Sequence, residues 1–208
     1  IGKRPMILDT VKRSIFKVIY KLYLWSAKSS DESFLGSRYI EYPYVIKQII
    51  KLIPRGSKVL LIGCAGDPLS TILPSLGFKV IGIDLKNVNI RYPDFEFVLA
   101  DIRKTMFPDS YFDAAVAVSV IEHVGLLEGD IKGDQRAFEE LKRILKPEGL
   151  LILTVPCSEK ERIEFGRVTQ RIYTKEGLKT SLNKYFRTEH IEYVPEAKIC
   201  LATTRNNK

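Results

Sequence analysis

Residues 59–70 read VLLIGCAGDPLS, and this stretch decides the fold. The apolar run at 59–62 is typical of a strand that is buried on both faces. Gly63 then opens a short polar turn, and Asp67 followed by Pro68 is the preferred N-cap before the preferred first helical residue. The stretch therefore predicts a strand, a tight turn and a helix, the unit that opens nucleotide-binding α/β domains.

The turn does not fit a dinucleotide. The fingerprint G-x-G-x-x-G falls on Gly63, Ala65 and Pro68, and only the first position matches. Ala65 obstructs the approach of a pyrophosphate, and the carboxylate of Asp67 competes for the amides that would hold an anion. The turn therefore favours a nucleoside ligand that carries positive charge, and it makes a hydride-transferring enzyme the last of the alternatives.

Strands and helices alternate along the rest of the chain. Apolar runs predict strands at 58–63, 79–84, 95–101, 112–119 and 150–155, and the segments 188–194 and 198–204 look like a closing antiparallel pair. Helices are predicted at 38–53, bent or started at Pro43, and at 68–76, 134–146 with Asp134 as N-cap, and 175–185. This order predicts a mostly parallel sheet with helices on both faces and a ligand at the carboxyl ends of the strands.

Two acidic residues end neighbouring strands of this predicted sheet. Asp84 closes the second strand, where a carboxylate accepts hydrogen bonds from ribose hydroxyls. Asp101 ends the third strand and can reach an adenine edge along the same rim. A cation, a ribose and an adenine together describe S-adenosylmethionine.

The chain resembles the class I S-adenosylmethionine-dependent methyltransferases over residues 38–204. The resemblance rests on VLLIGCAGDPLS, VIGIDL, FVLADIRK, FPDSYFDAAVAVSVIEHVG and LKRILKPEGLLILTVP, in the order and at the spacing of the methyltransferase type 11-like members. It implies a Rossmann-like seven-stranded sheet with an antiparallel last strand. It also implies cofactor-binding residues, which carry over as Gly63, Cys64 and Ala65 for the methionine part, Asp84 and Leu85 for the ribose and adenine, Asp101 and Ile102 for the adenine, and Ser119.

Candidate acceptor residues follow the fourth strand. His123 stands at the rim where an acceptor would lie, and an imidazole can take a hydroxyl proton near neutral pH. The alternative is that His123 caps a turn or covers the cofactor. Glu122 either binds the cofactor, orients His123 or is a solvated side chain, and Asp130 and Arg38 are candidates for binding the acceptor. Cys157 is a poor candidate for a nucleophile, because the matching cysteine motif after the fourth strand is missing.

The basic character of the chain is concentrated in residues 1–30. The formal net charge is +8, and this segment holds seven basic side chains against Asp9 alone, a net charge of +6. Apolar residues at spacings of three and four predict an amphipathic helix here. We therefore divide the chain into a helical extension with a linker at 1–37 and a cofactor domain at 38–208. The extension either packs on the domain or binds an anionic membrane surface or RNA.

Cysteine and histidine usage bears on the compartment. Three scattered cysteines argue against a disulfide framework, and with two histidines they argue against a metal site. The first residues lack the uninterrupted apolar core of a secretory signal, and no run is long enough to span a membrane. We expect a cytoplasmic protein, with a peripheral membrane location as an alternative.

The sequence as a whole predicts a methyltransferase that acts on a small molecule or a glycan, at a hydroxyl group. The first alternative is an RNA methyltransferase that uses the basic extension to hold its substrate. The second is a non-catalytic binding protein that retains the sheet, in which Ala65 and Asp67 have closed the cofactor site.

Overall fold

The computed structural model describes residues 37–166 and 168–207. The chain divides into two units, Ile1–Tyr39 and Ile40–Lys208. The predicted extension at 1–36 lies outside the described residues, so its helix and the boundary at residue 37 stay predictions. None of the helices that the structure describes is long and apolar enough to cross a membrane.

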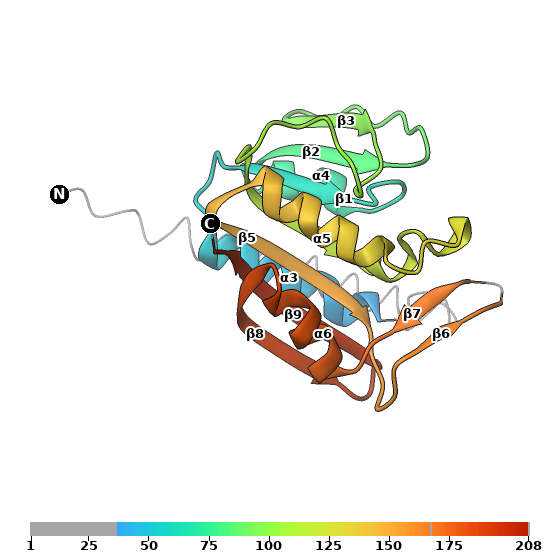
Figure 1. Cartoon of the computed structure of the whole chain (residues 1–208). Coiled ribbons are helices and arrows are strands. Elements are labelled where there is room, and N and C mark those ends of the chain that lie inside the picture. Colours follow the sequence, from blue (N-terminus) through green and yellow to red (C-terminus); the bar gives the residue numbers. More distant parts are fainter. Residues whose placement is uncertain (1–36, 167, 208) are drawn as a thin grey trace, which may run out of the picture. The chain divides into compact units, whose positions relative to one another are not determined.

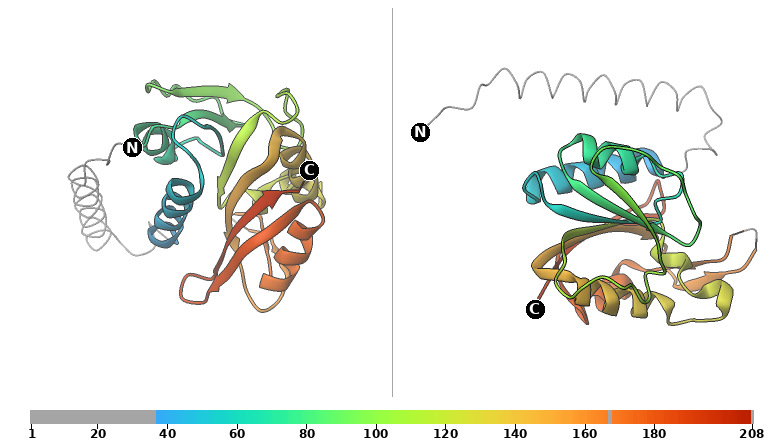
Figure 2. Two further views of the ribbon diagram at one scale, coloured as in Figure 1. Left: turned by 90° about the vertical axis from the view of Figure 1, so that its left-hand side faces the viewer. Right: turned by 90° about the horizontal axis from the view of Figure 1, so that it is seen from above.

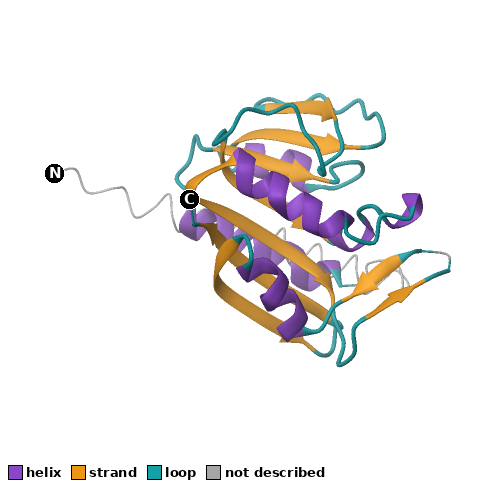
Figure 3. Cartoon of the chain, in the orientation of Figure 1, coloured by secondary structure: helices purple, strands orange, loops and turns teal. Residues whose placement is uncertain are grey.

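One seven-stranded sheet forms the centre of the domain, in the order β3-β2-β1-β4-β5-β9-β8 (Figures 1 and 3). Its strands are β1 (Lys58–Ile62), β2 (Lys79–Asp84), β3 (Phe95–Leu99), β4 (Phe112–Val118), β5 (Leu145–Pro156), β8 (Phe186–Val194) and β9 (Ile199–Asn206). Neighbours from β3 to β5 pair in parallel, whereas β9 runs antiparallel to both β5 and β8. The predicted fold class, including the antiparallel last strand, is confirmed.

The first predicted strand lies in the middle of the sheet. In β1, Leu61 is paired with Gly82 of β2 on one side and with Val116 of β4 on the other. Residues 59–62 are buried, as their unbroken apolar run predicts for a strand covered on both faces. The turn after β1 therefore opens at the carboxyl edge of the sheet, between the ends of β2 and β4.

Helices cover both faces of the sheet (Figure 2). Helices α3 (Arg38–Leu52) and α4 (Leu69–Ser75) lie on one face, and α5 (Gly133–Ile144) and α6 (Lys175–Asn183) on the other. Each face has its own apolar core. Val45 of α3 and Leu73 of α4 belong to one core, and Phe138 of α5 and Leu182 of α6 belong to the other. The two-faced burial is the physical reason for the continuous apolar strands.

The structure decides two details of the helices. Pro43 lies inside α3, one turn after its start, so the predicted alternative of a start at Pro43 is wrong and the alternative of a bend there stays a prediction. Asp134 is the second residue of α5 and does not cap it. The helix begins at Gly133, where the backbone packs so closely that a Cβ would lie 2.3 Å from the carbonyl oxygen of Val124.

Four short elements complete the fold and escaped prediction. They are the 3₁₀ turns η1 (Ile121–His123) and η2 (Leu126–Glu128), and the hairpin of β6 (Arg162–Glu164) and β7 (Gln170–Ile172). The hairpin strands pair only with each other, and each has three residues, too few for a recognisable alternation.

The expectation of unpaired cysteines was wrong, because Cys157 and Cys200 form a disulfide. The antiparallel pairing of β5 and β9 sets Val155 opposite Cys200 and brings the two cysteine Cα atoms to 5.5 Å. A separation of 43 residues hides this closeness in the sequence. The disulfide removes Cys157 as a nucleophile and leaves Cys64 as the free thiol of the described residues.

Candidate cofactor and acceptor site

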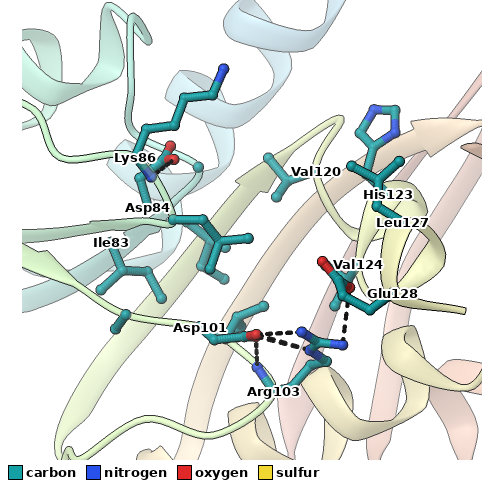
Figure 4. Close-up of a pocket in the computed structure, with 16 residues that line it drawn as sticks. Ile83, Asp84, Lys86, Asp101, Arg103, Val120, His123, Val124, Leu127 and Glu128 are labelled. Atoms are coloured by element: carbon teal, nitrogen blue, oxygen red, sulfur yellow. Dashed lines mark hydrogen bonds and ion pairs between the residues drawn. The ribbon is translucent and has the colours of Figure 1, made fainter. Parts of the chain in front are cut away.

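A cavity of about 360 Å³ opens at the carboxyl ends of β1, β2 and β4 (Figure 4). This volume lies in the range of small-molecule sites. Its wall consists of strand ends and of the loop that follows β4; it is lined by Ile62, Gly63, Ile83, Asp84, Leu85, Lys86, Ala100, Asp101, Ile102, Arg103, Val120, His123, Val124, Gly125, Leu127 and Glu128. The predicted ligand edge of the sheet is therefore where the cavity lies.

The turn after β1 needs glycine at two places. Gly63 has φ +71°, and a Cβ on it would lie 2.5 Å from Cγ2 of Val120. Gly66 has φ +77°, and a Cβ on it would have nothing within 4 Å, so only its backbone conformation calls for glycine. Gly63 lines the cavity as predicted, whereas Cys64 and Ala65 do not. Cys64 is fully buried, and this burial raises the pKa of its thiol to about 11.

Two carboxylates shape the same turn. Asp67 Oδ1 accepts a hydrogen bond from the amide of Leu69, the first residue of α4, at 2.8 Å, so Asp67 satisfies the helix start as predicted, although Pro68 and not Asp67 occupies the N-cap position. Asp84 Oδ2 accepts from the amide of Ala65, and its Oδ1 accepts from the amide of Lys86, both at 2.9 Å. Asp84 thus joins the end of β2 to the turn after β1, and each of its oxygens keeps a lone pair for a further donor.

Asp101 is held by an arginine that the sequence did not single out. Arg103 Nη2 lies 2.6 Å from Asp101 Oδ2, and its Nη1 lies 3.3 Å from Glu128 Oε2, so the guanidinium bridges two walls of the cavity (Figure 4). Burial tends to raise the pKa of Asp101, but the hydrogen bonds and charge of Arg103 outweigh it and lower that pKa below its usual range. Asp101 therefore stays an anion at the cavity wall.

Ser119 makes its side-chain hydrogen bond to α3. Its backbone is left-handed, with φ +49°, and its hydroxyl donates to the buried carboxylate of Glu41 at 2.6 Å. The hydroxyl of Thr154 also donates to Glu41 Oε1. Ser119 does not line the cavity, so its contact with a cofactor stays a prediction, while its visible contact fastens α3 to the ends of β4 and β5.

His123 lies on the cavity wall, and its ring is oriented by the hairpin. Its Nδ1 lies 2.8 Å from the carbonyl oxygen of Thr169. Because a carbonyl only accepts, Nδ1 carries the proton of a neutral ring and Nε2 keeps the lone pair. Glu122 is buried beside it, with Oε1 3.7 Å from Nε2. The two predicted residues are thus brought together, with a tautomer suited to accepting a proton.

A buried arginine holds the loop that carries His123. Arg171 of β7 is 6% exposed and donates to the carbonyl oxygens of Val124 and Ile131 at 2.8 Å, and to that of Asp130 at 3.1 Å. The carboxylate of Asp130 faces Arg103 and Arg136 instead of the cavity. Single-residue reasoning missed Arg171, because its partners are about 40 residues away in sequence.

Arg38, the other predicted acceptor residue, is the first residue of α3 and belongs to the unit Ile1–Tyr39. Its part in the site stays a prediction. In the described part of the chain, no group of three or more histidine, cysteine, aspartate or glutamate side chains is placed to hold a metal ion.

Comparison with known proteins identifies the domain. Residues 60–153 match the family model described as a methyltransferase domain. This part of the chain is a methyltransferase domain, in agreement with the predicted resemblance to the class I S-adenosylmethionine-dependent methyltransferases. The match covers β1 to β5 of this methyltransferase domain, which hold the cavity, the two acidic strand ends and His123.

Curated relatives are similar over part of their length. The chain is 30% identical over 131 residues to an Arabidopsis thaliana tRNA (carboxymethyluridine(34)-5-O)-methyltransferase, covering 62% of the chain and 31% of the relative. It is 37% identical over 112 residues to the mitochondrial ubiquinone biosynthesis O-methyltransferase of Bos taurus, covering 48% and 28%. The chain thus spans less than a third of these relatives.

A solved structure shares the fold of the described domain. The Burkholderia thailandensis 1,6-didemethyltoxoflavin-N1-methyltransferase, crystallised with S-adenosylhomocysteine, has a TM-score of 0.68 at 17% identity. The similarity covers 100% of this chain and 92% of that one.

The cavity of the methyltransferase suits S-adenosylmethionine, the cofactor of its family. Asp84 has free lone pairs for ribose hydroxyls, and Asp101 offers a carboxylate to an amino group. Ile83, Ile102 and Val124 supply apolar walls for an adenine ring. Asp67 places its charge on the helix start after the turn, as suits a cation better than a phosphate.

Proposed function

We propose that the protein transfers a methyl group from S-adenosylmethionine to an acceptor that enters beside the loop after β4. The observation that carries this proposal is the cavity at the strand ends, with Asp84 and Asp101 on one wall and His123 on the other. The cofactor would supply an electrophilic methyl on a sulfonium. The residues of the chain would align the two reactants, the main contribution that such a displacement needs.

The acceptor atom that we propose is a hydroxyl oxygen of a small molecule or a glycan. An O–H group must lose its proton as it is methylated, and His123 Nε2 carries the lone pair to accept it. The buried Glu122 beside Nε2 would stabilise the imidazolium that forms. The names of the two curated relatives support oxygen as the methylated atom in those proteins.

An RNA acceptor is the second candidate, and two observations favour it. Residues 1–30 carry a net charge of +6, and one relative is named for methylation of a tRNA uridine derivative. Binding through this extension would be electrostatic, so RNA affinity should fall steeply with salt. The cytoplasmic location stays a prediction, as does the alternative of a peripheral location at a membrane.

Methyl transfer from labelled S-adenosylmethionine to panels of glycans, small hydroxylated molecules and RNA tests the proposal. We expect label in a hydroxylated acceptor, and a loss of at least 100-fold in turnover for His123→Ala, much larger than its loss of affinity for S-adenosylhomocysteine. His190→Ala is the matched control, because His190 lies on β8, outside the cavity lining. Transfer to no acceptor together with no binding of S-adenosylhomocysteine would favour the non-catalytic alternative, in which Ala65 and Asp67 have closed the cofactor site.

A further inference from the structure

Large apolar side chains stand out in solvent on two neighbouring loops. Leu127 is 84% exposed and Ile131 68% exposed, both in the loop between η1 and α5. Phe165 is 80% exposed and Val168 56% exposed, both in the turn between β6 and β7. We call these four residues the apolar rim. Single exposed apolar side chains are common on protein surfaces, whereas four of them on two neighbouring loop tips indicate an interaction site.

Hydrogen bonds join the two loops of the apolar rim into one structure. Arg171, which follows the hairpin turn, donates to the carbonyl oxygen of Ile131 at 2.8 Å. Thr169, the neighbour of Val168, accepts from the ring of His123, also at 2.8 Å. Figure 1 shows the hairpin β6–β7 and the loop before α5 extending beyond the sheet in the same direction. The rim is therefore a fixed feature of one face.

The apolar rim borders the entrance for the acceptor. Leu127 itself lines the cavity, together with His123 and Val124, and Figure 4 shows Leu127 beside His123. An acceptor that reaches the cavity from the side of His123 therefore passes between the two loops. A partner that binds the apolar rim therefore lies directly beside the entrance of the cavity.

The size and charge of the apolar rim favour a lipid surface over a protein. A stable protein interface buries about 800 Å² on each partner, more than single side chains on two narrow tips provide. Arg162 is paired with Glu164, and Arg136 with Asp130, so the charges beside the rim largely cancel. Residues 1–30 carry +6 of the net charge of +8, so attraction to an anionic bilayer comes mainly from the extension, and insertion comes from the apolar rim.

We propose that the apolar rim inserts into the surface of an anionic phospholipid bilayer, so that the cavity receives its acceptor from the lipid phase. Docking brings the entrance beside His123 to the headgroup level. Exposed aliphatic and aromatic side chains suit the boundary between headgroups and acyl chains. The docking surface stands on its own observations, whereas delivery of an acceptor rests on the proposed methyltransferase function.

Flotation of the full chain with vesicles tests the proposal. The vesicles are phosphatidylcholine alone, or phosphatidylcholine with about 30% phosphatidylglycerol, at low and high salt. The test variant is Ile131→Ser with Phe165→Ser, since neither residue lines the cavity. The matched control is Leu99→Ser with Met106→Ser, which are 60% and 95% exposed away from the apolar rim. We expect the test variant to lose at least tenfold in partitioning to anionic vesicles, and the control to stay within twofold.

Three results would overturn the docking surface: no flotation of the unaltered chain, equal flotation of the test and control variants, or a change of molecular mass with the test variant on size exclusion. The last would assign the apolar rim to contacts between copies of the chain. Titration with S-adenosylhomocysteine separates the two claims. A chain that binds this ligand and ignores vesicles refutes docking alone, and one that floats without binding it refutes the proposed function alone.

Discussion

The two left-handed glycines of the turn after β1 allow a controlled test of how tightly this turn is packed. Gly63 and Gly66 have nearly the same φ, +71° and +77°. A Cβ at Gly63 meets Val120 Cγ2 at 2.5 Å, whereas a Cβ at Gly66 meets nothing within 4 Å. Alanine at Gly66 therefore measures the backbone cost alone, and alanine at Gly63 measures the same cost plus the contact.

The magnitudes follow from these two terms. A left-handed conformation costs a residue with a Cβ about 1–2 kcal/mol, and alanine offsets part of this by restricting the unfolded chain. We expect Gly66→Ala to lower the free energy of unfolding by about 1 kcal/mol. Overpacking against a stiff, β-branched side chain adds about 1–3 kcal/mol, so Gly63→Ala should cost about 3 kcal/mol.

Urea unfolding of both variants measures these values, and Val120→Ala supplies the cross-check. Removing the methyl groups of Val120 relieves the contact, so Gly63→Ala should cost about 1 kcal/mol in a Val120→Ala background. Binding of S-adenosylhomocysteine should weaken in Gly63→Ala, because Gly63 and Val120 both line the cavity. Equal losses of stability for Gly63→Ala and Gly66→Ala would refute the argument.

Three further predictions concern the walls of the site. Arg171→Met should lower the free energy of unfolding by about 3 kcal/mol and weaken S-adenosylhomocysteine binding, because the carbonyl groups of the loop after β4 lose their hydrogen-bond donor. The control Arg162→Met, at an exposed arginine, should change neither quantity. Urea unfolding and calorimetric titration measure the two effects. The pKa of Asp101 is lowered in the folded state, so the carboxylate stabilises the fold fully above about pH 4, and this stabilisation is lost as the pH falls through the lowered pKa. In Asp101→Asn, the free energy of unfolding measured by urea at a series of pH values should therefore fall less steeply below about pH 4. A thiol reagent should count one thiol, Cys64, in the unfolded and unreduced chain, and three after reduction; three thiols before reduction would contradict the disulfide of Cys157 with Cys200.

The sequence predicted those parts of the fold that depend on local patterns. The unbroken apolar runs placed the parallel strands, because burial on both faces needs them, and Asp67 with Pro68 placed the start of α4. Asp84 was placed at the cavity because the last residue of a parallel strand faces the ligand edge of the sheet. These features need no knowledge of the distant parts of the chain.

Features that depend on distant partners were missed. Arg171 looks like any surface arginine in sequence, and only the docking of the hairpin on the loop after β4 buries it. Arg103 bridges the cavity because Glu128, which is distant in sequence, forms an ion pair with it. Ser119 donates its hydrogen bond to Glu41 because α3 packs behind β4. The disulfide was missed for the same reason, since the pairing of β5 with β9 brings its cysteines together.

The measurement that tests the central claim most directly is calorimetric titration with S-adenosylhomocysteine, S-adenosylmethionine and NAD. Asp84→Ala is the test variant, and Asp109→Ala is the control, because Asp109 is exposed and outside the cavity lining. A hydrogen bond to a charged group contributes about 1.5–3 kcal/mol, so loss of those to the ribose predicts at least tenfold weaker binding in Asp84→Ala. We expect both sulfur compounds to bind and NAD not to bind. No binding of either sulfur compound, or equal binding by both variants, would contradict the assignment of the cavity to S-adenosylmethionine.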